Sequence, residues 1–99
     1  MSDADSTFDD AFGKIVDLGN NIADADSDAE LWDITDGLLA GAIQFWLYSR
    51  RPCGDPLCED CAPLNTAQAR LAELLRQARA HAEESEYFHA PTDANVGRA

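Results

Sequence analysis

The chain has 99 residues, of which 45% are hydrophobic and 26% are charged, and its formal net charge is −12 at pH 7. This length predicts one domain with a modest core, and this hydrophobic content argues against a wholly disordered chain. The negative charge argues against direct binding to nucleic acid through neutralisation of phosphates, and it favours a basic protein partner instead.

The negative charge is concentrated in residues 1–36, which carry eleven acidic residues against Lys14 alone. Residues 37–99 carry eight acidic residues and six arginines. Solubility or adaptation to salt explains this charge about as well as a basic partner does. The charge also fits an acidic mimic of nucleic acid that blocks a basic groove. No signal peptide pattern is visible, and the apolar run is shorter than the roughly 20 residues of a membrane span. We therefore expect a cytoplasmic protein without a membrane partner.

Residues 1–6 are polar and are expected to fray, and the first helix is predicted over residues 7–23. Gly19-Asn20-Asn21 should weaken this helix towards its end. The acidic connection that follows resembles the start of an EF-hand loop, but Ala29 and Thr35 replace its glycine and its bidentate glutamate, so no calcium site is expected. One stripe of apolar residues at helical spacing carries the helix prediction: Phe8, Phe12, Ile15, Val16 and Ile22.

The second helix is predicted over residues 28–49, because Ser27 and Glu30 match a capping box. Residues 38–48 of this helix read LLAGAIQFWLY and are apolar nearly all round. Such a helix must be covered on every side, and two neighbours in the same chain cover only part of it. We therefore expect a homodimer through this helix, unless its glycines simply pack under another helix of the same chain. The predicted interface residues are Gly37, Leu38, Gly41, Phe45, Trp46 and Tyr48.

Pro52 ends the second helix, and a loop is predicted over residues 52–63. Asn65 with Gln68 matches another capping box and predicts the third helix over residues 65–88, with an ion pair between Arg79 and Glu83. A polar tail is predicted over residues 90–99. These elements predict an all-α fold in which residues 1–99 form a single three-helix bundle with an up-down-up arrangement.

Cys53, Cys58 and Cys61 lie in the loop with the spacing C-x4-C-x2-C. The spacing matches three ligands of a plant-type iron–sulfur cluster, but the chain has no fourth cysteine. Zinc would need a fourth ligand, and His81 lies about 24 Å along the third helix at 1.5 Å per residue. A loop carboxylate or a partner's histidine would have to complete such a site. A disulfide or redox pair, and three small buried hydrophobes, are the other open interpretations.

No catalytic constellation and no phosphate-binding loop is visible, so we expect neither an enzyme nor a bound cofactor. The sequence favours a small acidic interaction module that dimerises through the second helix and presents its acidic surface to a protein partner. The alternatives are a zinc-binding or thiol-redox protein that uses Cys53, Cys58 and Cys61, and the nucleic-acid mimic.

Overall fold

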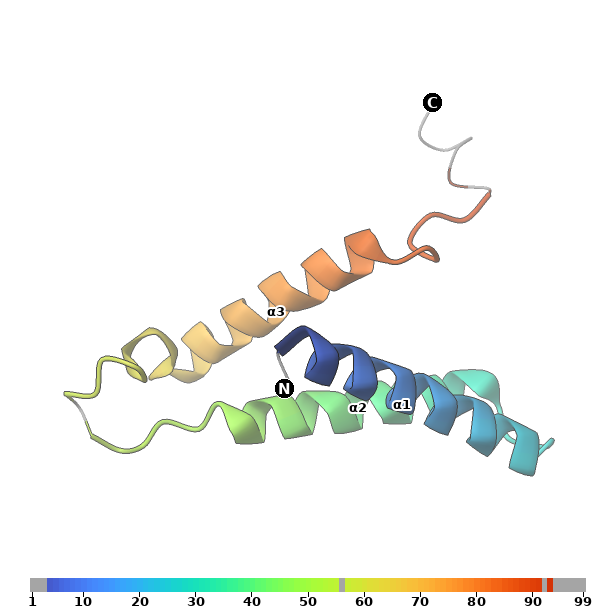
Figure 1. The fold of residues 1–99 in the computed structure, drawn as a ribbon, viewed down its shortest axis with the longest axis horizontal. Helices are drawn as coiled ribbons and strands as arrows, with labels where there is room; N and C mark the ends of the chain where they lie inside the picture. The colour runs from blue at the N-terminus through green and yellow to red at the C-terminus, as the bar shows by residue number, and fades with distance from the viewer. Residues whose placement is uncertain (1–3, 56, 92, 94–99) are drawn as a thin grey trace. The chain divides into compact units, whose positions relative to one another are not determined.

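The computed structural model describes residues 4–55, 57–91 and 93, and within them it contains helices and no strand. The elements are α1 (Ala4–Ala25), α2 (Leu31–Ser49), a short 3-10 helix η1 (Ala62–Leu64) and α3 (Ala67–Glu84) (Figure 1). The all-α class with three α-helices, expected from the sequence, is therefore confirmed. The chain divides into two compact units, and the first contains α1 and α2 while the second contains the cysteine loop, η1 and α3.

The first helix is longer than predicted at both ends. It already includes Ala4 to Ser6, and it continues through Gly19-Asn20-Asn21 as far as Ala25. At Gly19 an added Cβ would lie 2.9 Å from Leu38 Cδ1, so the absence of a side chain there lets the two helices approach closely. The glycine serves packing at this position instead of ending the helix.

The second helix begins at Leu31, three residues after the predicted start. The carboxylate of Asp26 accepts a hydrogen bond from the Asp28 backbone N–H (3.0 Å), and the Asp26 carbonyl accepts one from Ala29 (3.1 Å). Such side-chain bonds offer the backbone an alternative to the helix. The first helical bond of α2 runs from Ile34 N–H to the Glu30 carbonyl (3.1 Å). The capping box predicted at Ser27 therefore does not start this helix.

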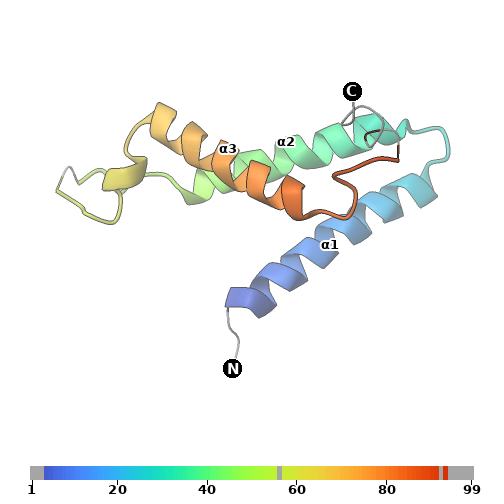
Figure 2. The same ribbon diagram turned by 90° about the horizontal axis from the view of Figure 1, so that it is seen from above.

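The helices α1 and α2 run in opposite directions and diverge from their connection (Figure 2). Among the side chains that the structure describes, Ile34 alone is buried, with 8% of its surface exposed. Large apolar side chains far from the connection stay exposed, including Phe12 on α1 and Phe45 on α2. The hairpin therefore holds a small contact near its connection and leaves apolar surface open elsewhere.

The third helix begins after Thr66 and ends at Glu84, so it is shorter than the predicted 65–88. Thr66 is its N-cap, since its side chain accepts a hydrogen bond from the Ala69 backbone N–H (3.0 Å). Ser85 ends the helix with an extended backbone, and its hydroxyl accepts a hydrogen bond from the Tyr87 N–H (3.1 Å). The predicted tail lies partly outside the described residues, because 92 and 94–99 are not among them.

Candidate functional site

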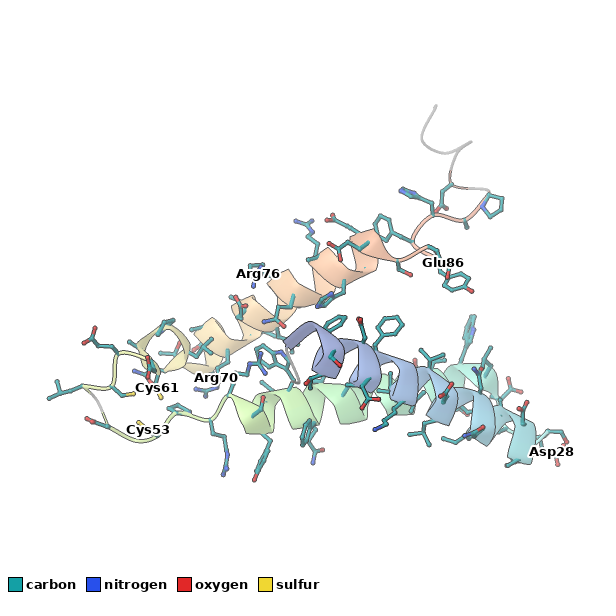
Figure 3. All side chains as sticks on the ribbon, viewed as in Figure 1. Asp28, Cys53, Cys61, Arg70, Arg76 and Glu86 are labelled. Atoms are coloured by element: carbon teal, nitrogen blue, oxygen red, sulfur yellow. The ribbon has the colours of Figure 1, made fainter. Side chains whose placement is uncertain are left out.

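The three cysteines form a cluster in the second unit. The sulfur atoms of Cys53, Cys58 and Cys61 all lie within 4.8 Å of one another. Figure 3 labels Cys53 and Cys61 in this loop. Cys53 is exposed, whereas Cys58 and Cys61 are half-buried, and none forms a disulfide. The interpretation of the three residues as buried hydrophobes is therefore wrong, because no member of the cluster is buried. The cluster lies at the surface, where small ligands can reach it.

A tight turn and local hydrogen bonds bring the three cysteines together. Gly54 has a φ of 92°, a left-handed conformation that favours glycine, and it reverses the chain directly after Cys53. The Asp55 carboxylate accepts a hydrogen bond from the Leu57 N–H (2.9 Å), and the Asp55 carbonyl accepts one from Cys58 (3.1 Å). The Ala62 N–H then donates to the Cys58 carbonyl (3.1 Å). These local bonds close the loop on itself without help from distant residues.

Hydrogen bonds to backbone carbonyls also hold the start of α3 against the end of the loop. The Leu64 N–H donates to the Cys61 carbonyl (2.9 Å), which shapes η1 directly after the last cysteine. Arg70 on α3 donates from its guanidinium to the Leu64 carbonyl (2.8 Å). The position of Cys61 is therefore fixed relative to the first turn of α3.

The three thiols differ in their electrostatic environment. The Cys53 backbone N–H donates a hydrogen bond to the Cys61 sulfur (3.4 Å). Hydrogen bonds from the backbone and then the thiol of Cys61 lower the pKa of Cys58. The Cys53 backbone acts to lower the pKa of Cys61, but hydrogen bonds with the Cys58 and Cys53 thiols outweigh it and raise that pKa overall. The cluster therefore favours a first thiolate at Cys58, with its neighbours as donors.

Neither a carboxylate of the described loop residues nor one of the chain's two histidines, His81 and His89, joins the cluster as a fourth ligand. Within the described residues, the group whose ligand atoms lie within 4.8 Å of one another consists of the three cysteines and includes no histidine or carboxylate oxygen. Neither His81 nor His89 therefore belongs to it, as the predicted distance along the third helix indicated for His81. The sequence spacing pointed to the three cysteines, but it does not specify the turn at Gly54 or the backbone bond to Cys61.

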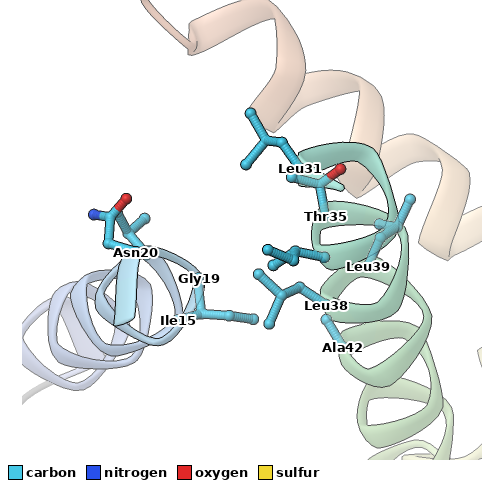
Figure 4. Close-up of a pocket in the computed structure, with 10 residues that line it drawn as sticks. Ile15, Gly19, Asn20, Leu31, Thr35, Leu38, Leu39 and Ala42 are labelled. Carbon is cyan, nitrogen blue, oxygen red and sulfur yellow. The ribbon is translucent and has the colours of Figure 1, made fainter. Parts of the chain in front are cut away.

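A second candidate site is an apolar groove between α1 and α2 in the first unit, with a volume of about 390 Å³. Figure 4 shows Ile15 and Gly19 of α1 opposite Leu38 and Ala42 of α2. The α1 side of this groove was not predicted as a site, although its apolar residues were assigned to the stripe of the first helix. The groove is lined by Ile15, Val16, Gly19, Asn20, Leu31, Ile34, Thr35, Leu38, Leu39 and Ala42.

The residues predicted for a dimer interface are distributed over more than one environment. Leu38 and Trp46 are half-buried, and Leu38 lines the groove. Phe45 is 71% exposed and its ring stacks on Tyr48 with 6.2 Å between the centroids. Gly37 and Gly41 face open space, since an added Cβ would meet no atom within 4 Å. These residues do not form one buried contact within the chain.

The comparisons with known proteins identify no relative: no family model, no curated protein and no solved structure matches the chain. The helices of the described residues include none with the length and hydropathy that crossing a membrane requires.

Proposed function

We propose that this protein is a small, non-enzymatic interaction module that forms a homodimer through α2 and presents its acidic surface to a basic protein partner. The observation that supports this proposal is the exposure of the large apolar side chains of the helical hairpin, where Trp32 is 81% and Phe45 is 71% exposed. Because exposed apolar surface of this extent is rare in monomers, it favours a covered interface.

The distribution of apolar residues around α2 favours a second copy as the occupant. Ile34, Leu38 and Phe45 share one face of the helix at intervals of four and seven residues, whereas Trp32 and Leu39 lie on another face. The helix α1 lies against the face that carries Ile34 and Leu38, since Leu38 approaches Gly19 of α1. Two hairpins that pack their open faces together would form a four-helix bundle, a common solution for such surfaces.

Gly37 and Gly41 support the same arrangement. Glycine inside a helix costs about 0.5–1 kcal/mol relative to alanine. Close approach of a helix from a second chain would compensate for this cost, since both glycines face open space within their own chain.

The acidic surface supports a basic partner of the dimer. Residues 1–36 carry eleven acidic residues against Lys14 alone, and Asp10 is paired with Lys14 at 2.8 Å on the surface of α1. From Asp9 onwards, the other acids of this region, including Asp17 and Asp33, are exposed. Two copies would double this negative surface, and a basic protein would associate with it rapidly because complementary fields steer the encounter.

The test is the molar mass of the full chain by sedimentation velocity across the micromolar range. We expect a dimer for the native chain and a monomer for Phe45→Glu, because a charge would be buried in the interface. Leu57→Glu is the matched control, since Leu57 is 86% exposed in the cysteine loop. A native chain that stays folded and monomeric throughout the range would refute the proposal.

The variant Gly41→Ala tests whether the dimer interface lies on α2. Within one chain this substitution should stabilise the helix by about 0.5–1 kcal/mol. In a dimer with closely packed helices it should instead weaken association, whereas Gly13→Ala, also in an open position on α1, should not. Equal dimer affinities for both variants and for Phe45→Glu would exclude α2 as the interface.

A further inference from the structure

We propose that the loop of Cys53, Cys58 and Cys61 binds one zinc ion through three thiolates, with the fourth coordination position open to a ligand from outside the chain. The proposal concerns the second unit and does not depend on dimerisation through α2. It rests on the mutual distances of the sulfur atoms, on the backbone bonds that fix them, and on the charge of the loop.

The sulfur atoms are already close to the geometry that zinc requires. Tetrahedral Zn–S bonds of about 2.3 Å place two sulfur ligands roughly 3.8 Å apart. The sulfur atoms of the cluster lie within 4.8 Å of one another. Each pair therefore needs to close by about 1 Å at most, which side-chain rotation in an exposed loop can supply.

The loop also provides the hydrogen bonding that is typical around metal ligands. The Cys53 N–H donates to the Cys61 sulfur (3.4 Å), and groups of this kind orient ligands and moderate the charge of a bound thiolate. Gly54 permits this contact because its left-handed backbone, with a φ of 92°, turns the chain directly after Cys53. The sulfur cluster and its donor thus come from the same local fold.

The charge of the loop favours a cation. Between Pro52 and Pro63 the chain contains three acidic residues, Asp55, Glu59 and Asp60, and no basic residue. These acids oppose three unpaired thiolates at one place, whereas a divalent cation would offset the charge. On binding, the thiol protons are released to solvent and the thiolates become the ligands.

Competing chemistry fits the cluster less well. A disulfide would use two sulfur atoms and leave the third without a role, and an iron–sulfur cluster takes four thiolates. Soft thiolates select zinc among the common divalent ions, and tetrahedral sulfur sites are typical of it. Within the described residues no histidine or carboxylate joins the group, so a water molecule or a ligand from another molecule would complete the site.

The experiment uses the full chain, reduced and freed of metal with a chelator, and then titrated with zinc chloride. Native mass spectrometry should show one zinc per chain, and competition with a chromophoric chelator gives the affinity. Loss of a group that hydrogen-bonds a metal ligand typically lowers the metal affinity by about 10–100-fold. Loss of a ligand itself should lower it further, so we expect Cys58→Ser to weaken zinc binding by more than about 100-fold. Glu84→Gln is the matched control, because Glu84 is an exposed acid at the end of α3 and lies outside the loop, and this variant should bind zinc as tightly as the native chain.

Cobalt(II) gives a second readout that does not depend on the stability of the variants. Its complex with the native chain should show a thiolate-to-cobalt charge-transfer band and the intense visible bands of a tetrahedral site. Three results would overturn the proposal: no zinc retained by the reduced chain, Cys58→Ser binding zinc as well as the native chain, or octahedral cobalt without a thiolate band.

Discussion

Glu73 on α3 is held by two neighbours on its own helix. Its carboxylate accepts hydrogen bonds from Arg76 Nε (2.9 Å) and from the side-chain amide of Gln77 (2.9 Å). The hydrogen bonds from Arg76 and then Gln77 lower the pKa of Glu73 from its ordinary value of 4.5 to about 2. The same pair raises the pKa of Arg76. This is the i,i+3 counterpart of the i,i+4 pair that the sequence predicted between Arg79 and Glu83.

We expect the Glu73 carboxyl to titrate near pH 2 in the native chain and close to its ordinary value in Arg76→Gln. Because the folded pKa is depressed, the stabilisation of α3 by this carboxylate is complete above about pH 4.5 and is lost as the pH falls towards 2. Carboxyl chemical shifts from NMR measure the titration. Arg79→Gln is the control, since Arg79 lies 4.0 Å from Glu83 and makes no bond to Glu73. An unchanged Glu73 titration in Arg76→Gln would contradict the assignment.

Substitutions at the start of α3 show which residue caps this helix. Thr66 accepts the Ala69 N–H (3.0 Å), whereas the sequence predicted Asn65 as the cap. We expect Thr66→Ala to lower the free energy of unfolding of α3 by about 1 kcal/mol, the usual cost of losing a cap. Hydrogen exchange at the Ala69 amide should accelerate in this variant and change little in Asn65→Ala. Equal acceleration in the two variants would show that both side chains share the cap.

The elements illustrate what the sequence predicts and what it does not. The apolar spacing that runs through Phe8, Phe12 and Ile15 predicted a helix correctly, because many residues contribute to one periodic signal. The end of α2 at Ser49 matches the prediction, but other helix ends were predicted less well, because local side-chain hydrogen bonds lie beside them. Asp26, Thr66 and Ser85 supply these bonds, and each competes with neighbouring residues of similar capping ability.

The two candidate sites differ in the same way. The cysteine spacing identified Cys53, Cys58 and Cys61 as possible ligands, and the structure brings their sulfur atoms together. The apolar groove depends on which residues of α1 face α2, and this follows from the close contact of Gly19 with Leu38. A single helical stripe cannot specify that contact, since it fixes which side of a helix is apolar but not the partner against which it packs.

At the scale of the whole molecule, apolar exposure and charge act in opposite directions on the proposed dimer. Each copy carries a net charge of −12, so two copies repel each other. The exposed apolar side chains of the hairpin, such as Phe12 and Phe45, drive association and are insensitive to salt screening. The dissociation constant of the dimer should therefore change with ionic strength. The direction of this change distinguishes apolar contacts from ion pairs at the interface.

We expect the dissociation constant of the dimer to fall when sodium chloride is raised from about 0.01 to 0.15 M, because the Debye length shortens from roughly 30 to 8 Å and screens the repulsion between the copies. Sedimentation equilibrium at both salt concentrations measures this change. Binding of a basic protein partner should respond in the opposite direction, since screening weakens attraction between unlike charges. A dimer that dissociates as salt is added would contradict the apolar interface. It would place ion pairs between the acidic residues of one copy and the arginines of the other at the contact instead.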